Sequence, residues 1–242
     1  MKKVYVVGIG PGGADGLTAD ARRALEESDL LCGYTVYIEL IRPAFPGKPV
    51  LSTPMTQEAA RCRAALEKAA AGATVAIVCS GDPGVYGMAG LVLELAASYP
   101  QVAVEVVPGV TAATAGAAVL GAPLMHDFAV ISLSDLLTPW EKIEARLRAA
   151  AQADFVICLY NPASRRRADY LARACAILLE TCPPGTACGW VRNIGRSGQE
   201  SHTCTLAQLS EVPADMFTTV YIGNRETRLE GDRLLTPRGY RL

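Results

Sequence analysis

The chain of 242 residues has only two histidines, His126 and His202, and none of its eight cysteines forms a Cys-x-x-Cys pair. A metal cage of His and Cys ligands needs several such side chains at close spacing, so we predict no structural metal. The cysteines lie within strand-like and helix-like segments, such as Val156-Ile157-Cys158. We therefore expect buried, reduced thiols.

Long apolar runs and an excess of charge of one sign are also absent. No apolar run reaches about 18 residues, the length that a membrane-spanning helix needs. The first residues enter a strand-like segment that ends at Gly8, without a cleavage-site pattern, so we expect a cytoplasmic protein. The formal net charge is -1, which predicts no bulk attraction to nucleic acid. We expect partners to be small molecules, with neither nucleic acid nor membrane among them.

Short apolar runs alternate with helix-like stretches, which is the pattern of βαβ units. In the first half we predict strands at 4–8, 75–79 and 102–107, and helices at 18–28, 56–71 and 85–98. The runs 75–78 and 104–107 are rich in β-branched residues, as in strands that are covered on both faces. The pattern pauses at Leu120-Gly121-Ala122-Pro123, where we place a domain boundary.

A second α/β series follows that pause. We predict strands at 128–133, 154–160, 186–191 and 218–222, and helices from Pro139 and from about Arg166 to Thr181. Thr138-Pro139-Trp140-Glu141 combines an N-cap threonine, a proline at the first helical position and a capping-box glutamate. The predicted fold class is α/β, with two domains over residues 1–121 and 122–242, each a mixed, mostly parallel sheet flanked by helices.

The segment Gly8-Ile9-Gly10-Pro11-Gly12-Gly13 has the G-x-G-x-x-G spacing of dinucleotide-binding proteins. Its context argues against NAD or FAD, because Pro11 interrupts the motif and helix signals resume only at Thr18, outside the glycines. No acidic residue ends the next strand-like segment, 29–32. A structural tight turn and a backbone loop that lines another ligand are the remaining interpretations.

Two further strand ends carry glycines. Ser80-Gly81-Asp82-Pro83-Gly84 follows the strand at 75–79, and Pro108-Gly109-Val110-Thr111-Ala112 follows the strand at 102–107. Open α/β sheets bind ligands at the carboxyl ends of their strands. The Asp82 carboxylate can accept hydrogen bonds from ribose hydroxyls or an amine, although a plain turn before a helix is the alternative. Three such ends favour a ligand cleft over three unrelated turns.

These three loops resemble, in order and spacing, those of the tetrapyrrole methyltransferases. Segments such as Gly33-Tyr34-Thr35-Val36-Tyr37, Tyr160-Asn161-Pro162-Ala163-Ser164-Arg165 and Val191-Arg192-Asn193-Ile194-Gly195-Arg196, together with 125–140, are similar to the precorrin-3B C17-methyltransferases of that family. The similarity spans essentially the whole chain.

The resemblance implies S-adenosylmethionine as cofactor, held in a cleft between the two domains, a tetrapyrrole substrate and a homodimer. On the matching positions it implies that the cofactor is bound by Gly10, Pro11, Ser80, Gly81, Asp82, Val85, Thr111, Ala112, Tyr160, Asn161, Arg192 and Asn193.

The resemblance also implies methyl transfer to C17 of a precorrin, coupled to ring contraction in which the carbon that bridges rings A and D is extruded. The sulfonium methyl and the enamine-like carbon are both already reactive, so the protein mainly aligns them in a dry cleft. Contraction requires a base for a hydroxyl proton. We assign His126 and Asp135 as catalytic candidates and consider Asp127 as well. A hydrogen-bonded structural histidine and a turn before a helix are the alternatives.

Ser164 resembles an N-cap, which would place Arg165, Arg166 and Arg167 in the first turn of a helix. Helix N-termini favour anions, so three cations there suggest a compensating anion, such as the carboxylates of a precorrin. We assign Arg165, Arg166 and Ser134 to the substrate site. Solvated arginines whose stems cover apolar surface are the alternative.

Three other functions remain open from the residues. One is a sibling methyltransferase that acts on another macrocycle position or on uroporphyrinogen. Another is a diphthine-synthase-like enzyme that methylates a protein residue. The third is a noncatalytic nucleotide-binding module.

Overall fold

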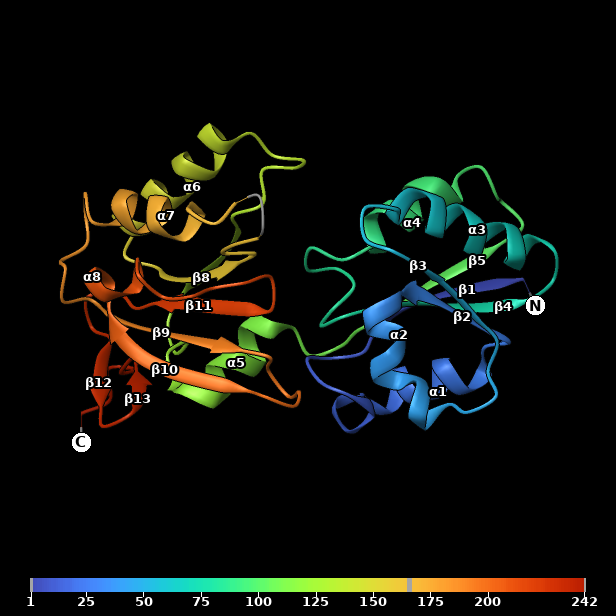
Figure 1. The fold of residues 1–242 in the computed structure, drawn as a ribbon, viewed down its shortest axis with the longest axis horizontal. Helices are drawn as coiled ribbons and strands as arrows, with labels where there is room; N and C mark the ends of the chain where they lie inside the picture. Colours follow the sequence, from blue (N-terminus) through green and yellow to red (C-terminus); the bar gives the residue numbers. More distant parts are fainter. Residues whose placement is uncertain (1, 165–166, 242) are drawn as a thin grey trace. The chain divides into compact units, whose positions relative to one another are not determined.

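The computed structural model describes residues 2–164 and 167–241, and these form two compact units, Met1–Ala112 and Ala113–Leu242 (Figure 1). The division falls at the start of helix α5 (Ala112–Leu120), whereas the sequence predicted it at the end of that helix, after residue 121. Helix α5 packs with the second unit, because the Ala113 carbonyl accepts a hydrogen bond from the buried Tyr221 hydroxyl at 2.9 Å.

The first unit is built on a five-stranded parallel sheet. Its strands, in spatial order, are β3 (Val50–Thr53), β2 (Leu30–Tyr34), β4 (Thr74–Cys79), β1 (Lys3–Gly8) and β5 (Ala103–Val107). The connections contain α1 (Ala19–Glu27), α2 (Thr35–Ile41), α3 (Glu58–Ala70) and α4 (Ala89–Ala96), with short 3-10 turns η1 (Ala14–Gly16) and η2 (Arg42–Ala44).

Alternate side chains of β1 enter two separate cores, because successive residues of a strand point to opposite faces. Val4 and Val6 pack with Leu66 of α3 in one core. Tyr5 and Val7 lie in the other, which also contains Leu25 and Ile38 of α1 and α2. The sheet is therefore covered on both faces by helices.

Strand β4 confirms the prediction of a strand covered on both faces, whereas β5 does not. Residues 75–79 are all buried, but β5 is an edge strand in which Glu105 is exposed and Val106 is 40% exposed. Both segments are apolar runs, and their position in the strand order decides the difference.

The second unit is built on a five-stranded mixed sheet. Its strands, in spatial order, are β10 (Glu200–Thr205), β9 (Ala187–Arg192), β11 (Thr218–Ile222), β8 (Val156–Tyr160) and β7 (Phe128–Ser132). Strand β11 is antiparallel to both of its neighbours, and β7 is parallel to β8. Consequently β7, β8 and β9 run in the same direction, and their carboxyl ends share one edge of the sheet.

Helices also cover both faces of this sheet. Val220 and Ile222 pack in a core with α6 (Trp140–Gln152), α7 (Tyr170–Leu178) and α8 (Leu206–Leu209). Tyr221 points the other way, toward α5. A small sheet of β12 (Arg228–Glu230), β13 (Arg233–Leu235) and β6 (Gly121–Ala122) completes the unit.

Two predicted helix starts are wrong. The N-cap of α6 is Pro139, not Thr138, and no side chain caps it; the Pro139 carbonyl instead accepts from Lys142 N at 3.0 Å. Helix α7 begins at Tyr170, not near Arg166. Before that helix, Ser164 and Arg167 exchange backbone hydrogen bonds of 3.3 and 3.0 Å, so the Arg167 carbonyl is paired with Ser164 N.

Elements at the margins of the sheets were missed altogether. Besides helix α2, which packs in the core on one face of the first sheet, the most important are the edge strands β3 and β10 and the β12–β13 hairpin. Their exposed or mixed burial leaves little of the alternating hydrophobic pattern that identifies a strand from sequence.

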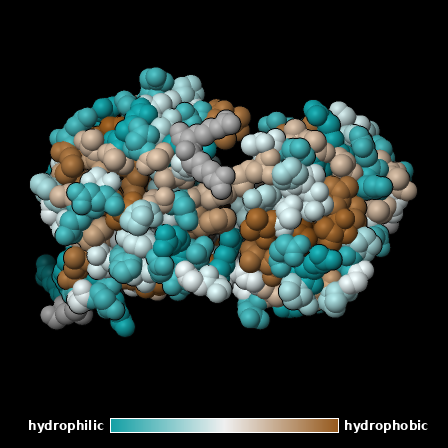
Figure 2. All heavy atoms as spheres, viewed as in Figure 1, coloured by the Kyte–Doolittle hydropathy of each residue, from teal (hydrophilic) through white to brown (hydrophobic). Residues whose placement is uncertain are grey.

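Two further features concern the surface of the described residues and their cysteine thiols. Within the described residues, no helix is long and apolar enough to cross a membrane, and hydrophilic and hydrophobic side chains are interspersed on the visible faces of both units (Figure 2). All eight cysteines are free thiols, six of them buried. Burial raises the pKa of Cys32 to about 12, so this thiol stays protonated at neutral pH.

We expect Gly116→Ala in α5 to lower the free energy of unfolding, although alanine is the better helix former. The new Cβ would lie 2.3 Å from the buried Tyr221 Oη, and such overpacking costs about 1–3 kcal/mol. The matched control is Gly90→Ala in α4, where nothing lies within 4 Å of the new Cβ. That change should be neutral or stabilise by up to about 1 kcal/mol. Urea unfolding measures both, and equal stability of the two variants would contradict the packing.

Candidate active site

Three loops meet at the carboxyl edge of the first sheet, after β1, β4 and β5. Gly10 and Gly81 exchange two backbone hydrogen bonds of 3.1 and 2.9 Å, and both have left-handed φ angles, +70° and +66°. A Cβ on Gly8 would lie 2.6 Å from Gly81 O, and one on Gly109 would lie 2.3 Å from the same oxygen. The loops touch backbone to backbone, which only glycine permits.

Asp82 ties two of these loops together. Its Oδ1 accepts from Gly84 N at 2.8 Å, and its Oδ2 accepts from Gly109 N at 3.1 Å. The sequence suggested that this carboxylate receives ligand hydroxyls or an amine. In the structure both oxygens already hold backbone amides, although each carboxylate oxygen can accept a second hydrogen bond.

The first loop does not open a helix, in agreement with the prediction that it is no dinucleotide fingerprint. After the glycines comes η1, and α1 begins only at Ala19, where the Thr18 hydroxyl caps Ala21 N at 3.1 Å. Pro11 lies partly exposed in the loop.

The remaining predicted residues of the first unit belong to the same edge. Val85 N donates to Asp82 O at 3.3 Å. A side chain on Gly81 would reach the backbone of Thr111 and Ala112, at 3.6 and 3.7 Å. Ser80 directly follows β4 and is partly exposed, as are Val85 and Thr111. The eight cofactor residues predicted in this unit are therefore gathered at one edge.

The second unit gathers its predicted cofactor residues at the carboxyl ends of β8 and β9. The Tyr160 hydroxyl accepts from Ala113 N at 2.7 Å, and thus fixes the start of α5. Asn161 Nδ2 donates to Ser132 Oγ, at the end of β7, at 2.9 Å. Asn161 and Asn193 both have a left-handed φ of +53°, a conformation that asparagine tolerates better than most residues.

Arg192 and Asn193 end β9 at this edge. The Arg192 guanidinium pairs with Glu200 across the β9–β10 ladder. Asn193 N donates to Phe217 O at 3.2 Å, and its Nδ2 donates to Gly198 O at 3.3 Å. Asn193 therefore shapes the turn through its backbone and side chain together.

A polar cluster lies beside these ends and is centred on Arg167. Its guanidinium donates to Ser134 Oγ at 2.8 Å, Asp135 Oδ1 at 3.2 Å and Ser164 Oγ at 3.1 Å. Asp135 Oδ2 accepts from the Tyr170 hydroxyl at 2.6 Å. The hydrogen bond from Tyr170, with a further one from Arg167, lowers the pKa of the Asp135 carboxyl.

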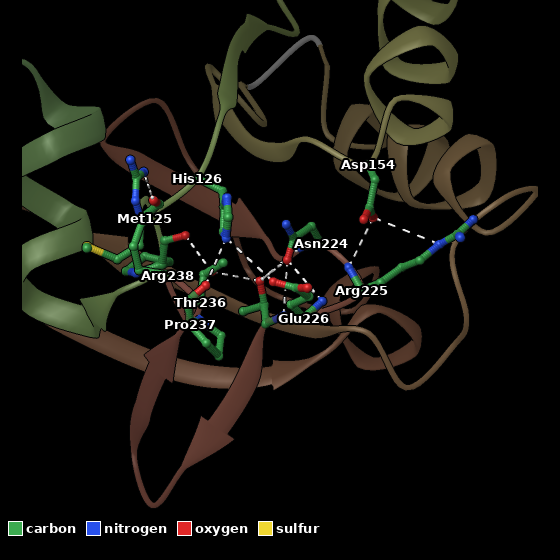
Figure 3. A network of polar contacts seen from close by, with 11 residues as sticks. Met125, His126, Asp154, Asn224, Arg225, Glu226, Thr236, Pro237 and Arg238 are labelled. Atoms are coloured by element: carbon green, nitrogen blue, oxygen red, sulfur yellow. Dashed lines mark hydrogen bonds and ion pairs between the residues drawn. The ribbon is translucent and has the colours of Figure 1, made fainter. Parts of the chain in front are cut away.

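His126 lies at the opposite edge of the sheet, because it precedes β7 whereas Asp135 follows it. Its Nε2 is 2.8 Å from the Pro237 carbonyl oxygen and 3.5 Å from Glu226 Oε2 (Figure 3). Asp127 belongs to this edge as well, where its backbone oxygen accepts from Val156 N. The structure therefore does not bring the two catalytic candidates together.

The arginine prediction needs a correction. Arg165 and Arg166 lie outside the described residues. Arg167 precedes α7, so it is not in a helical first turn, and its compensating anion is Asp135. Sequence reasoning missed Ser164 and Tyr170 as members of this cluster, and Ser132 as the partner of Asn161. Of the residues at this edge, only Ser132 and Ser134 could have been identified from the sequence, because they are polar residues at the end of an apolar strand.

Over residues 2–164 and 167–241, no group of three or more His, Cys, Asp or Glu side chains is arranged to hold a metal ion.

Each of the two α/β units carries its loops and polar side chains at the carboxyl edge of its sheet, which is where open α/β sheets of enzymes bind their ligands. The chain belongs to the tetrapyrrole (corrin/porphyrin) methylases, whose family model matches residues 3–210. It is therefore a methyltransferase of a family that acts on tetrapyrroles.

Individual relatives show which members of this family the chain is similar to. The chain is 48% identical to a probable cobalt-factor III C(17)-methyltransferase from Salmonella typhimurium, over 98% of this chain and 99% of that protein. It is 45% identical to a cobalt-factor III methyltransferase from Priestia megaterium, over 98% of this chain and 45% of that longer protein.

Solved structures of methyltransferases have a similar fold. The crystal structure of the methyltransferase CobJ matches with a TM-score of 0.90 and 40% identity, over 97% of this chain and 99% of that one. A uroporphyrin-III C-methyl transferase from Thermus thermophilus, solved with S-adenosyl homocysteine, shares the fold at 24% identity and a TM-score of 0.74, over 91% and 97% of the two chains.

We expect Asp135→Asn to reduce stability at neutral pH and to lose this effect in acid. A carboxyl whose pKa is lowered on folding stabilises the folded chain above its unfolded pKa of about 3.9, and this stabilisation disappears as the pH falls through the lower folded value. The partly exposed ion pair limits the loss at pH 7 to about 0.5–1 kcal/mol.

Urea unfolding at several pH values between neutrality and acid measures this difference. Asp232→Asn, in the exposed turn between β12 and β13, is the control and should leave stability unchanged. A deficit of Asp135→Asn that stays constant down to the most acidic condition would show that the carboxylate charge is not what stabilises the cluster.

Proposed function

We propose that the protein transfers a methyl group from S-adenosylmethionine to C17 of cobalt-factor III or precorrin-3B, with contraction of the macrocycle, in cobalamin biosynthesis. The observation that carries the proposal is the similarity over nearly full length to C17-methyltransferases, together with the gathered loops at the sheet edges. We also propose a homodimer, as the family resemblance implies.

The residues of the first unit fit a nucleoside methyl donor. Strand carboxyl ends are where open α/β sheets bind such ligands. The packed glycines bring Pro11, Val85 and Thr111 to one edge as partly exposed residues, beside the remaining acceptor capacity of Asp82. When bound, S-adenosylmethionine supplies an activated methyl group on a sulfonium. The work of the chain is then to hold the donor and the nucleophilic ring carbon in line.

The predicted catalytic residues take different roles in this proposal. Asp135 lies at the carboxyl edge, but both of its oxygens accept hydrogen bonds and its pKa is lowered, which makes it a weak base. We propose that it positions Arg167 and the loop that follows β7. A role of His126 as the base stays a prediction, and its location at the other edge of the sheet argues against it.

The decisive experiment is an incubation of the purified protein with S-adenosylmethionine and each tetrapyrrole. We expect cobalt-factor III or precorrin-3B to gain the mass of one methyl group at C17, with the visible spectrum changing as the ring contracts. Uroporphyrinogen III should gain none. Methylation of uroporphyrinogen, or of another macrocycle position, would contradict the assignment and identify a sibling activity.

We expect Asp82→Ala to weaken S-adenosylmethionine binding about tenfold or more, because two loops lose their shared anchor. Calorimetry measures the dissociation constant. Asp20→Ala is the matched control in the same unit, since Asp20 is 61% exposed and pairs with Arg23 of its own helix. Undiminished binding by a folded Asp82→Ala variant, or tight binding of NAD, would refute the cofactor assignment.

A further inference from the structure

Two adjacent leucines stand in solvent on the loop between β7 and α6. Leu136 is 68% exposed and Leu137 is 98% exposed, the highest value among the large apolar side chains described. This loop projects from the body of the second unit, as the yellow-green segment that leads into α6 (Figure 1). Neither leucine belongs to the core of the unit.

The base of the same loop is held firmly. Leu133 is fully buried, and Ser134 and Asp135 both accept hydrogen bonds from Arg167. Tyr170 adds a hydrogen bond of 2.6 Å to Asp135. On the far side, Trp140 packs against the Tyr170 ring with 4.6 Å between centroids. Anchors on both sides therefore keep two apolar side chains in water at the tip.

The location of the tip suggests what it meets. The loop follows the carboxyl end of β7, next to the end of β8 with Tyr160 and Asn161. This is the edge at which α/β sheets bind ligands. The protein belongs to a family that acts on tetrapyrroles, and a tetrapyrrole has a broad apolar ring face with carboxylates at its rim. The apolar side chains of the tip match the ring face.

We infer that Leu136 and Leu137 contact the ring face of the tetrapyrrole substrate and determine its affinity. This inference rests on the proposed function and adds a specificity element to it. The tip removes apolar surface of the substrate from water, while the Arg167 cluster fixes where the tip stands. Two leucines presented by an anchored loop lose little conformational freedom on binding, so most of their burial contributes to affinity.

The test is a double variant, Leu136→Ser with Leu137→Ser, assayed with cobalt-factor III and S-adenosylmethionine. We expect KM for the tetrapyrrole to rise about tenfold or more, because two buried leucine contacts are lost. The calorimetric dissociation constant for S-adenosylmethionine should not change. The conservative double variant Leu136→Met with Leu137→Met should restore KM to within about threefold of the parent, since methionine replaces leucine at similar volume.

Leu229→Ser in β12 is the matched control, because Leu229 is an exposed leucine of the same unit, 41% exposed, on a different sheet. It should leave KM unchanged. Urea unfolding and sedimentation of all variants complete the comparison. The serine double variant should keep the unfolding midpoint and the sedimentation coefficient of the parent.

Each other outcome overturns the inference. An unchanged KM in a parent enzyme that turns over shows that the tip does not touch substrate. A lower unfolding midpoint or a changed oligomeric state, with KM changing in step, shows that the leucines pack on protein. If the parent itself methylates no tetrapyrrole, the proposed function is refuted, and so is the inference that rests on it. An assay of the parent alone distinguishes this outcome from an unchanged KM in an active enzyme.

Discussion

Direct contact between the backbones of three loops is the constraint on which the first unit depends. A methyl group added to Gly8 or to Gly109 would lie well under 3 Å from a carbonyl or an amide of a neighbouring loop. At Gly81 the constraint is different, because this residue has a left-handed φ. Because β4, β1 and β5 are neighbours in one parallel sheet, their carboxyl ends are forced together. The glycines convert this proximity into a compact edge.

Asp82 stabilises this edge through hydrogen bonds within the chain. Its two oxygens hold amides of two different loops, so the carboxylate connects segments that lie 27 residues apart in the chain. Of the two amides, that of Gly109 makes a part-buried hydrogen bond, and a buried backbone amide without a partner is costly. The carboxylate therefore fixes the conformation of the edge through contacts within the chain.

In the second unit, side chains rather than glycine backbones hold the strand ends in place. Tyr160 and Tyr221 bind the amide and the carbonyl of Ala113 and so fix the start of α5, while Ser132 and Asn161 link the ends of β7 and β8. Arg167 connects the loop after β7 to the segment before α7. Because its charge is matched by Asp135, this guanidinium organises loops in the described structure.

The sequence by itself determined the α/β class, the main strands and the three glycine-bearing strand ends, because buried strands such as β4 and loops built from glycine leave patterns within a few consecutive residues. It also indicated the family. The tertiary structure alone decided that β5 is an edge strand, that Asp82 binds the neighbouring loop, that Asp135 pairs with Arg167 and Tyr170, and that His126 stands at the other edge of its sheet. These facts depend on strand order and on contacts between residues that are distant in the chain, and neither leaves a local pattern.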